Sequence, residues 1–424
     1  MVSNDGRYLT DERGEPFLWL GDTAWELLHR LTREETTEYL DVRARQGFNV
    51  VQAVLLAEND GVRTPNAYGR RPLRQNARGD YDPTLLDTQG GYSYWDHVDF
   101  VLSEAQKRGM VVALLPTWGD KYNRQCNGMG PELFSPENAF AYGRLLGQRY
   151  GARENLVWVL GGDRHLAEER HLLVNRALAE GLKAGGAAQL MTFHPRGDAS
   201  SSQYVGEESW LDFHMTQSGH GDFITKNWEL IAADYARSPK KPVVEGEPKY
   251  EDHPPRFQLG TGFFDAFDTR KAAYWAMFSG ALGVTYGHSS VWCMIREEER
   301  TDYHFLTWRE ALGRPGAENY GIMGRFLRAE GFPRRVPAQE ALAYCGVGDE
   351  HFAASRLDDR LAVYSPYGMP IRLAPGWDRP KTACFFDPRT GEYAPARAGQ
   401  TVRCPSSGRN CDWVLLLTYG EAAL

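Results

Sequence analysis

Short apolar runs alternate with stretches of helical periodicity through most of this chain. Each run gives way to Gly, Pro or polar residues, as buried parallel strands do before their loops. Eight such strand and helix units favour a closed (β/α)8 TIM barrel, an α/β fold, over an open doubly wound sheet. No G-x-G-x-x-G motif opens a helix, which argues against a dinucleotide-binding sheet. The eight predicted strands cover residues 17–20, 48–56, 110–115, 156–160, 189–193, 211–215, 242–245 and 283–286.

The pattern changes after residue 311. A helical stretch leads to Pro333 and Pro337, and short strand-like runs then recur between turn sequences such as residues 387–391. We therefore predict two domains, a (β/α)8 catalytic barrel over residues 1–332 and a small antiparallel β-sandwich over residues 333–424. The second contains no catalytic cluster, so we expect it to pack on the barrel while the barrel loops alone build the active site.

Composition restricts the partners of the protein. The net charge is −8 and 25% of the residues are charged, which provides no broad basic surface for nucleic acid. No apolar run of about 18 residues is present, so no membrane segment is expected. Residues 1–12 are polar, which predicts a cytoplasmic protein unless a signal peptide was removed. The 12 Trp and 21 Tyr residues suit stacking on sugar rings, which predicts a carbohydrate substrate. The oligomeric state stays open.

The six cysteines are scattered and form no metal-binding motif. We expect free thiols in a reducing compartment, with a Cys404–Cys411 bridge as the alternative. We predict neither a cofactor nor a metal.

Two of the predicted strands are followed, within three residues, by an acidic side chain. Residues 156–160 lead into Gly161-Gly162-Asp163, and residues 242–245 lead into Gly246-Glu247-Pro248. In a parallel barrel the active site lies at the carboxyl ends of the strands, so Asp163 and Glu247 should face a substrate. Two carboxylates on one rim predict glycoside hydrolysis. The structural alternative is that these acids cap helices or pair with Arg side chains.

Four motifs in this order resemble the apiosidase-like family of glycoside hydrolases: residues 17–25, 47–52, 158–163 and 246–251. The resemblance implies a retaining clan A (β/α)8 enzyme followed by a collagen-binding-type β-domain. It implies Asp163 as acid/base and Glu247 as nucleophile. It also implies a pentofuranoside or related sugar, in a plant- or microbe-derived glycan or oligosaccharide, as the substrate. An Asp acid departs from the Asn-Glu pair that most clan A enzymes carry after the fourth strand.

The same retaining mechanism can be argued from chemistry without the family resemblance. Retention requires one protonated carboxyl and one ionised carboxylate about 5 to 5.5 Å apart. Apolar surface and a neighbouring carboxylate would keep Asp163 protonated, and His214 and His288 would keep Glu247 ionised. Glu245 has the same strand parity as Glu247 and should be a buried supporting acid. Glu251 lies in the following loop, where we expect it to bind substrate.

Other residues at the predicted strand ends combine hydrogen-bonding groups with flat stacking faces, as sugar recognition requires. The Arg-rich stretch from Arg63 to Arg78 is expected to be a long solvated loop, with clamping of an acidic sugar as the alternative. The candidate substrate-binding residues are Asp22, Trp25, Asn59, Trp118, Lys121, Tyr122, His165, His194, His214, Gln217, Tyr250, Glu251, His288 and Trp292.

Two other functions remain open. His165, His194, His214 and His288 with Asp22 could form the cluster of a metal-dependent barrel hydrolase, although no H-x-H follows the first strand and no H-E-x-x-H occurs. A catalytically inactive carbohydrate-binding protein is the second alternative. The presence of both carboxylates argues against it.

Overall fold

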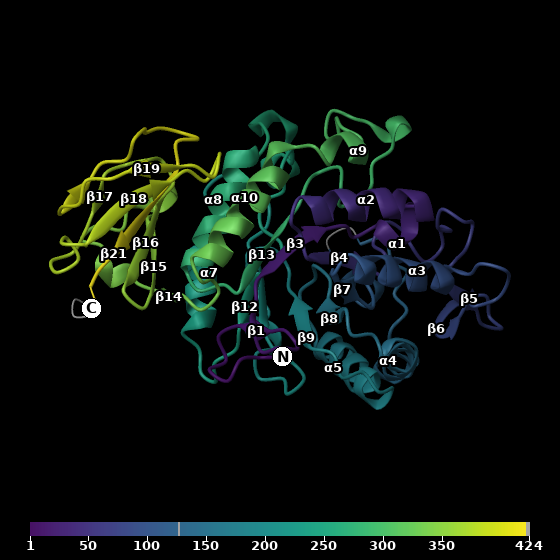
Figure 1. The fold of residues 1–424 in the computed structure, drawn as a ribbon. Coiled ribbons are helices and arrows are strands. Elements are labelled where there is room, and N and C mark those ends of the chain that lie inside the picture. Colours follow the sequence, from purple (N-terminus) through teal and green to yellow (C-terminus); the bar gives the residue numbers. More distant parts are fainter. Residues whose placement is uncertain (126–127, 421–424) are drawn as a thin grey trace. The chain divides into compact units, whose positions relative to one another are not determined.

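The computed structural model describes residues 1–125 and 128–420. The chain forms two compact units (Figure 1). Unit 1 comprises residues 1–20, 218–286 and the chain from 313 on, and unit 2 comprises residues 21–217 and 287–312. Each of the eight predicted runs contains a strand, and the alternation of strands with helices is confirmed in both units.

Unit 2 contains a parallel sheet. Its neighbouring strands run in the order β3 (Trp19–Thr23, paired from Gly21 on), β4 (Val50–Val54), β7 (Val111–Leu115), β8 (Leu156–Gly161) and β9 (Met191–His194). β11 (His214–Gln217) follows beside β9, because the Asp212 N–H donates to the Met191 carbonyl at 2.9 Å. The short strand β10 (Ala199–Ser200), which the sequence did not predict, pairs antiparallel with β11.

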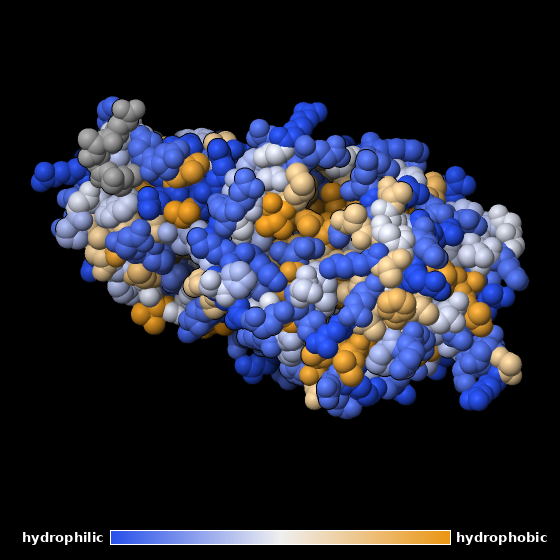
Figure 2. All heavy atoms as spheres, turned by 90° about the horizontal axis from the view of Figure 1, so that it is seen from below, coloured by the Kyte–Doolittle hydropathy of each residue, from blue (hydrophilic) through white to orange (hydrophobic). Residues whose placement is uncertain are grey.

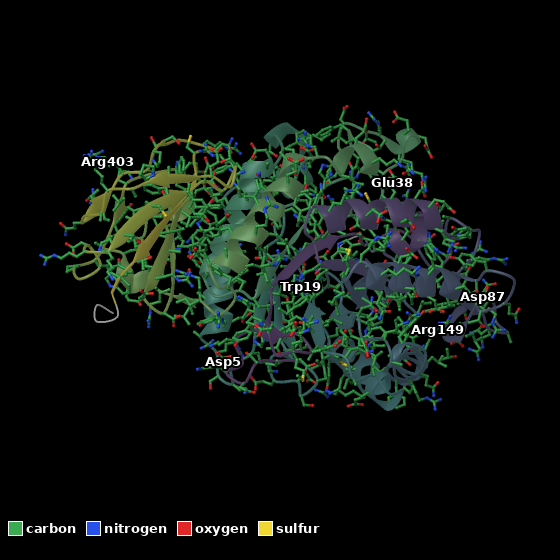
Figure 3. All side chains as sticks on the ribbon, in the orientation of Figure 1. Asp5, Trp19, Glu38, Asp87, Arg149 and Arg403 are labelled. Atoms are coloured by element: carbon green, nitrogen blue, oxygen red, sulfur yellow. The ribbon has the colours of Figure 1, made fainter. Side chains whose placement is uncertain are left out.

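Helices follow the strands of unit 2. Several begin at capping boxes, in which the side chains of Thr32, Ser93 and Ser135 accept a hydrogen bond from the backbone three residues later. The helices are α1 (Leu27–Arg30), α2 (Arg33–Arg45), α3 (Tyr94–Lys107), α4 (Pro136–Tyr150), α5 (Glu169–Ala184), α6 (Ser202–Val205) and α9 (Trp308–Ala311). Glu38, labelled in Figure 3, projects from α2 and pairs with Arg309 of α9 at 3.0 Å. The Arg-rich segment is not only a loop, because β5 (Leu73–Gln75) and β6 (Tyr81–Leu86) form a hairpin there.

Unit 1 contains the last two parallel strands, β12 (Val243–Glu245) and β13 (Gly283–Tyr286). Trp19, at the start of β3 and labelled in Figure 3, is buried and donates from Nε1 to the Thr285 hydroxyl at 3.0 Å. The accompanying elements are the short pair β1 (Leu9–Thr10) and β2 (Pro16–Phe17), and the helices α7 (Asn227–Tyr235), α8 (Ala266–Phe278) and α10 (Pro315–Ala329).

The C-terminal part of unit 1 is an antiparallel sheet domain (Figure 1). It packs on α8: Arg270 donates to both carboxylate oxygens of Asp412, at 2.9 and 2.6 Å, and both side chains are buried. Asp387 and Arg389 pair with each other, within this domain. The sheet order is β14 (Val336–Pro337), β15 (Ala353–Leu357), β16 (Arg360–Ser365), β21 (Trp413–Thr418), β18 (Thr382–Phe386) and β19 (Tyr393–Pro395), beside the separate pair β17 (Ile371–Arg372) and β20 (Thr401–Val402).

The face drawn in Figure 2 is mostly hydrophilic, with apolar residues gathered in small groups. No helix within residues 1–125 and 128–420 has the length and apolar character needed to cross a bilayer. The five described cysteines are free thiols, so the alternative Cys404–Cys411 bridge was wrong; Cys126 lies outside the described residues.

Candidate active site

The Gly-Gly-Asp motif ends β8 in a conformation that few residues accept. Gly161, Gly162 and Asp163 have φ angles of 93°, 107° and 54°, so three consecutive residues are left-handed. A Cβ at Gly161 would lie 2.4 Å from the His194 carbonyl oxygen, and one at Gly162 would lie 2.6 Å from the Gly119 nitrogen. The two glycines are therefore required by the backbone. They form a sharp turn at the end of β8, and Asp163 is the last residue of that turn.

The neighbouring strand ends hold this turn in place. The Gly119 N–H, after β7, donates to the Gly162 carbonyl at 3.0 Å, and the Asp163 N–H donates to Nδ1 of His194 at 3.3 Å. The Asp163 side chain is 33% exposed, and its Oδ2 accepts a hydrogen bond from Arg164 at 3.1 Å. Solvent can thus reach the carboxyl, while the adjacent guanidinium favours its ionised form.

Aromatic rings surround the His194 side of this turn. The ring centroids of Trp25 and Trp118 lie 5.3 Å apart, and each lies within 5.8 Å of the His194 ring. All three predicted candidates therefore come together in unit 2. Within the described part of the chain, the buried Nε1 of Trp118 has no hydrogen-bond acceptor. All three side chains are buried, so the cluster packs beside the turn inside unit 2.

His165 lies in a second polar group of unit 2. Its Nδ1 is 2.6 Å from the Tyr204 hydroxyl, and its Nε2 accepts from Arg196 at 2.6 Å. Burial and the charge of Arg196 lower the His165 pKa, so the ring is neutral. A neutral ring that accepts from Arg196 donates from Nδ1 to Tyr204.

Several predicted candidates are engaged in buried contacts. Asp22 is fully buried; its Oδ2 accepts from the Tyr39 hydroxyl at 2.5 Å and from Arg43 at 2.7 Å. Burial raises the Asp22 pKa, against the opposing charge of Arg43. Lys121 pairs with Asp120 at 2.6 Å, and both side chains are buried. These contacts give Asp22 and Lys121 a role in holding the ends of β3 and β7.

The remaining candidates of unit 2 lie on β11 and in several loops. Asn59 is exposed, and its N–H donates to Oε1 of Glu26 at 3.3 Å; Tyr122 is buried. His214 and Gln217 are buried on β11, where Nδ1 of His214 lies 3.4 Å from the Ser201 hydroxyl. Nδ1 of His288 accepts from the Ser290 N–H at 2.9 Å. The carbonyl of the half-buried Trp292 accepts from the Glu26 N–H at 3.1 Å.

Glu247, after β12 in unit 1, has a different environment. Only 7% of its side chain is exposed, and its Oε1 accepts from the Tyr250 hydroxyl at 2.7 Å and contacts Nε2 of His220 at 3.1 Å. The His220 ring packs on the rings of Tyr250 and His253, at 4.1 and 4.5 Å. Donors directed at one oxygen stabilise the carboxylate form of Glu247. His220 was not predicted, although it follows the strand end at Gln217 by only three residues.

The two neighbouring acids support this segment. Glu245 is buried, as its strand parity predicts, and accepts from the Ser218 N–H at 3.1 Å and from Asn227 at 3.4 Å. Glu251 is also fully buried; it accepts from the Tyr286 hydroxyl at 2.6 Å and the Gly316 N–H at 3.0 Å. Burial raises the Glu251 pKa to about 7. Glu251 thus joins the end of β13 to the first turn of α10.

The metal alternative receives no support from this arrangement. Across residues 1–125 and 128–420, no three His, Cys, Asp or Glu side chains form a group that could hold a metal ion. The cluster considered from the sequence, His165, His194, His214 and His288 with Asp22, is therefore not assembled.

Comparisons with known proteins identify the family of both parts of the chain. Residues 3–333 match the family described as "Apiosidase-like, catalytic domain", and residues 336–418 match "Putative collagen-binding domain of a collagenase". A solved structure described as a glycoside hydrolase is 30% identical with a TM-score of 0.86, and the match covers 99% of this chain and 96% of that one. A glycoside hydrolase family 5 structure from Bacteroides vulgatus is also 30% identical, with a TM-score of 0.88 and coverage of 100% and 94%.

A family 39 glycoside hydrolase from Bacteroides cellulosilyticus shares the fold alone, with 11% identity, a TM-score of 0.54 and coverage of 98% and 82%. The comparison with curated proteins gave no match. The strand and helix alternation, the carboxylates at two strand ends and these neighbours define the class as glycoside hydrolase. Within that class, the chain belongs to the apiosidase-like family, and the resemblance predicted from its motifs is confirmed.

Proposed function

We propose that this protein is a retaining glycoside hydrolase in which Asp163 is the acid/base and Glu247 is the nucleophile. The observation that carries the proposal is the contrast between the two carboxyl groups. Glu247 is buried and accepts from Tyr250, whereas Asp163 stands on a sharp turn and is partly open to solvent. A nucleophile must stay ionised, and an acid/base must exchange protons with water.

The reaction proceeds in two displacements. Glu247 attacks the anomeric carbon while the bond to the leaving oxygen breaks, and Asp163 gives its proton to that oxygen. A glycosyl ester on Glu247 results. Water then attacks the anomeric carbon, Asp163 takes the proton of that water, and the ester bond breaks. The product sugar keeps the configuration of the substrate, and both carboxyl groups return to their starting states.

The proposal includes a (β/α)8 barrel with a C-terminal β-sandwich, because only a common rim would let the two acids act on one bond. It requires carboxyl oxygens about 5 to 5.5 Å apart. The substrate that we propose is a pentofuranoside or related sugar in a plant- or microbe-derived glycan or oligosaccharide. The apiosidase-like family match supports that sugar class.

A panel of aryl pentosides, hexosides and uronides tests the function. We expect turnover of at least one aryl glycoside, with product of retained configuration by ¹H NMR. Both Asp163→Asn and Glu247→Gln should lose turnover of a substrate with a poor leaving group. Asp302→Asn and Glu154→Gln, at exposed positions, serve as matched controls. Inverted product would contradict the retaining mechanism. Unchanged activity in both site variants would contradict the assignment, and an inactive wild type would favour the binding-protein alternative.

A further inference from the structure

Phe257 is the most exposed aromatic residue that the structure describes, with 67% of its surface open to solvent. It lies in unit 1, in the long loop after β12 that also carries Glu247, and neither the sequence motifs nor the proposed reaction uses it. Single exposed apolar residues are common on protein surfaces and need no explanation. Phe257 is unusual because its backbone is strained and because its ring contacts the surroundings of the proposed nucleophile.

The backbone at Phe257 has a conformation that a bulky side chain rarely adopts. Arg256 and Phe257 have φ angles of 55° and 60°, so two consecutive residues that are not glycine are left-handed. Bonds to the loop after β11 hold them there. The Arg256 N–H donates to the His220 carbonyl at 2.9 Å, and the Arg256 side chain donates to Oδ2 of Asp222 at 2.8 Å. Gly at position 257 would adopt this conformation without strain, so the phenyl ring is kept at a conformational cost.

Ring contacts connect Phe257 to the nucleophile within unit 1. The centroid of the Phe257 ring lies 4.7 Å from that of the His253 ring and 6.3 Å from that of the His220 ring, at interplanar angles of 82° and 79°. Nε2 of His220 in turn contacts Oε1 of Glu247 at 3.1 Å. His253 and His220 are both buried. Phe257 is therefore the exposed end of a layer of rings whose inner end lies against the Glu247 carboxylate.

The Phe257 ring has a face open to a ligand. Both His rings are nearly perpendicular to it, so neither covers one of its faces by parallel stacking, and two thirds of the residue is exposed. A flat apolar face of this kind suits stacking on a sugar ring or an aryl group. Trp25 and Trp118, which were expected to stack on sugar, are both buried. Phe257 supplies the exposed stacking face that these two residues do not.

The exposed position of Phe257 also indicates which part of the substrate it meets. The sugar that forms the ester with Glu247 must lie against the buried inner end of the layer. The leaving group departs after the first displacement and water takes its place, so the leaving group occupies the side of the site that opens to solvent. Phe257, at the exposed end of the layer, is therefore placed to contact the leaving group.

We propose that Phe257 is a substrate-binding residue whose open ring face stacks on the first ring of the leaving group. This inference rests on the proposed function and adds a specificity to it. A leaving group that contains a sugar or aryl ring gains the contact, and a leaving group without a ring does not. Because the contact is present both before and during bond cleavage, it lowers KM and leaves kcat nearly unchanged.

Phe257→Ala tests the inference with two substrates of the same sugar, the one whose aryl glycoside the wild type turns over. The 4-nitrophenyl glycoside has a ring in its leaving group, and the glycosyl fluoride has none. We expect kcat/KM to fall about 10- to 100-fold for the nitrophenyl glycoside, mainly through KM, and by less than about twofold for the fluoride. Phe257→Trp keeps a flat face and should keep the wild-type values. Tyr393→Ala removes an exposed ring that packs on Phe386 at 5.3 Å in the C-terminal domain, and should change neither value.

A second measurement needs no turnover. Phenyl thioglycosides of the sugars in the panel resist hydrolysis, and the Kd of the one that binds the wild type, from an NMR titration, should rise about tenfold or more in Phe257→Ala. The Kd should not change in Tyr393→Ala. Equal losses for the nitrophenyl glycoside and the fluoride in a folded Phe257→Ala protein, or no loss for either, overturn the inference while the proposed function stands. A wild type that turns over no member of the panel would instead overturn the proposed function.

Discussion

The two proposed catalytic acids sit in contrasting surroundings. Glu247 lies in a nearly closed environment in which Tyr250 and His220 both contact its Oε1. Asp163 is the last of three consecutive left-handed residues, a third of its side chain is exposed, and Arg164 pairs with it. The first arrangement stabilises one charge state, and the second lets a proton come and go. Both acids follow a strand end, so their different surroundings, and the charge states that these favour, distinguish the two proposed roles.

The largest effect should come from Glu247→Ala, because no glycosyl-enzyme can form without the nucleophile. Turnover should fall to background for every substrate. Azide should restore cleavage of an activated aryl glycoside and give a glycosyl azide of inverted configuration, as read by ¹H NMR. If azide instead gave the product of retained configuration, the roles of the two acids would have to be exchanged in the proposal.

Asp163→Ala should depend on the leaving group. Cleavage of a natural glycosidic bond should fall by about 10² to 10⁴-fold, the usual contribution of general acid catalysis. Formation of the glycosyl-enzyme from a dinitrophenyl glycoside should persist, and azide should speed its turnover with retained product. Rates for a series of aryl glycosides give the measurement. A loss that is equal for good and poor leaving groups would argue against the acid role.

Tyr250→Phe tests whether the surroundings of Glu247 stabilise its carboxylate. It removes the hydroxyl that donates to Oε1 at 2.7 Å and leaves His220 in place. A hydrogen bond to a charged group contributes about 1.5 to 3 kcal/mol, so kcat should fall by roughly 10- to 100-fold. The acidic limb of the pH profile should also move up, because Glu247 becomes easier to protonate. Tyr344→Phe, at an exposed position, is the control and should change neither quantity.

Gly162→Ala tests the turn that carries Asp163. The added Cβ would lie 2.6 Å from the Gly119 nitrogen, at a φ of 107° that Ala rarely adopts. We expect the free energy of unfolding to fall by about 1 to 3 kcal/mol in urea titrations. Gly91→Ala, where the Cβ would meet no atom within 4 Å, should change it by less than about 1 kcal/mol. Equal stability of the two variants would show that the turn is not constrained as the backbone indicates.

The sequence predicted more of the fold than of the site. Strand runs and capping signals such as Ser93 and Ser135 act within a few residues, so their structures could be foreseen. The hairpin β5–β6 could not, because its residues lack clear alternation. Among site residues, Trp25, Trp118 and His194 come together as predicted, since each follows a strand end in one sheet.

The partners of the acids were harder to foresee. His220 and Tyr250 both contact Glu247, and the first is 27 residues away in the chain. Glu251 was expected to meet substrate, yet its carboxylate bonds to Tyr286 and Gly316, which are 35 and 65 residues away. Such contacts depend on how loops fold back on the strands. No local pattern of residue types encodes them.

The amino-acid sequence by itself determined the alternation of strands and helices and the two strand ends that carry Asp163 and Glu247. These properties depend on backbone conformation and on burial of apolar side chains, which act over short stretches. Only the tertiary structure decided that Tyr250 donates to Glu247, that His220 contacts the same oxygen and that Gly161 and Gly162 have no room for a Cβ. Proton affinity depends on the charges and donors within a few ångströms in space, whatever their separation along the chain.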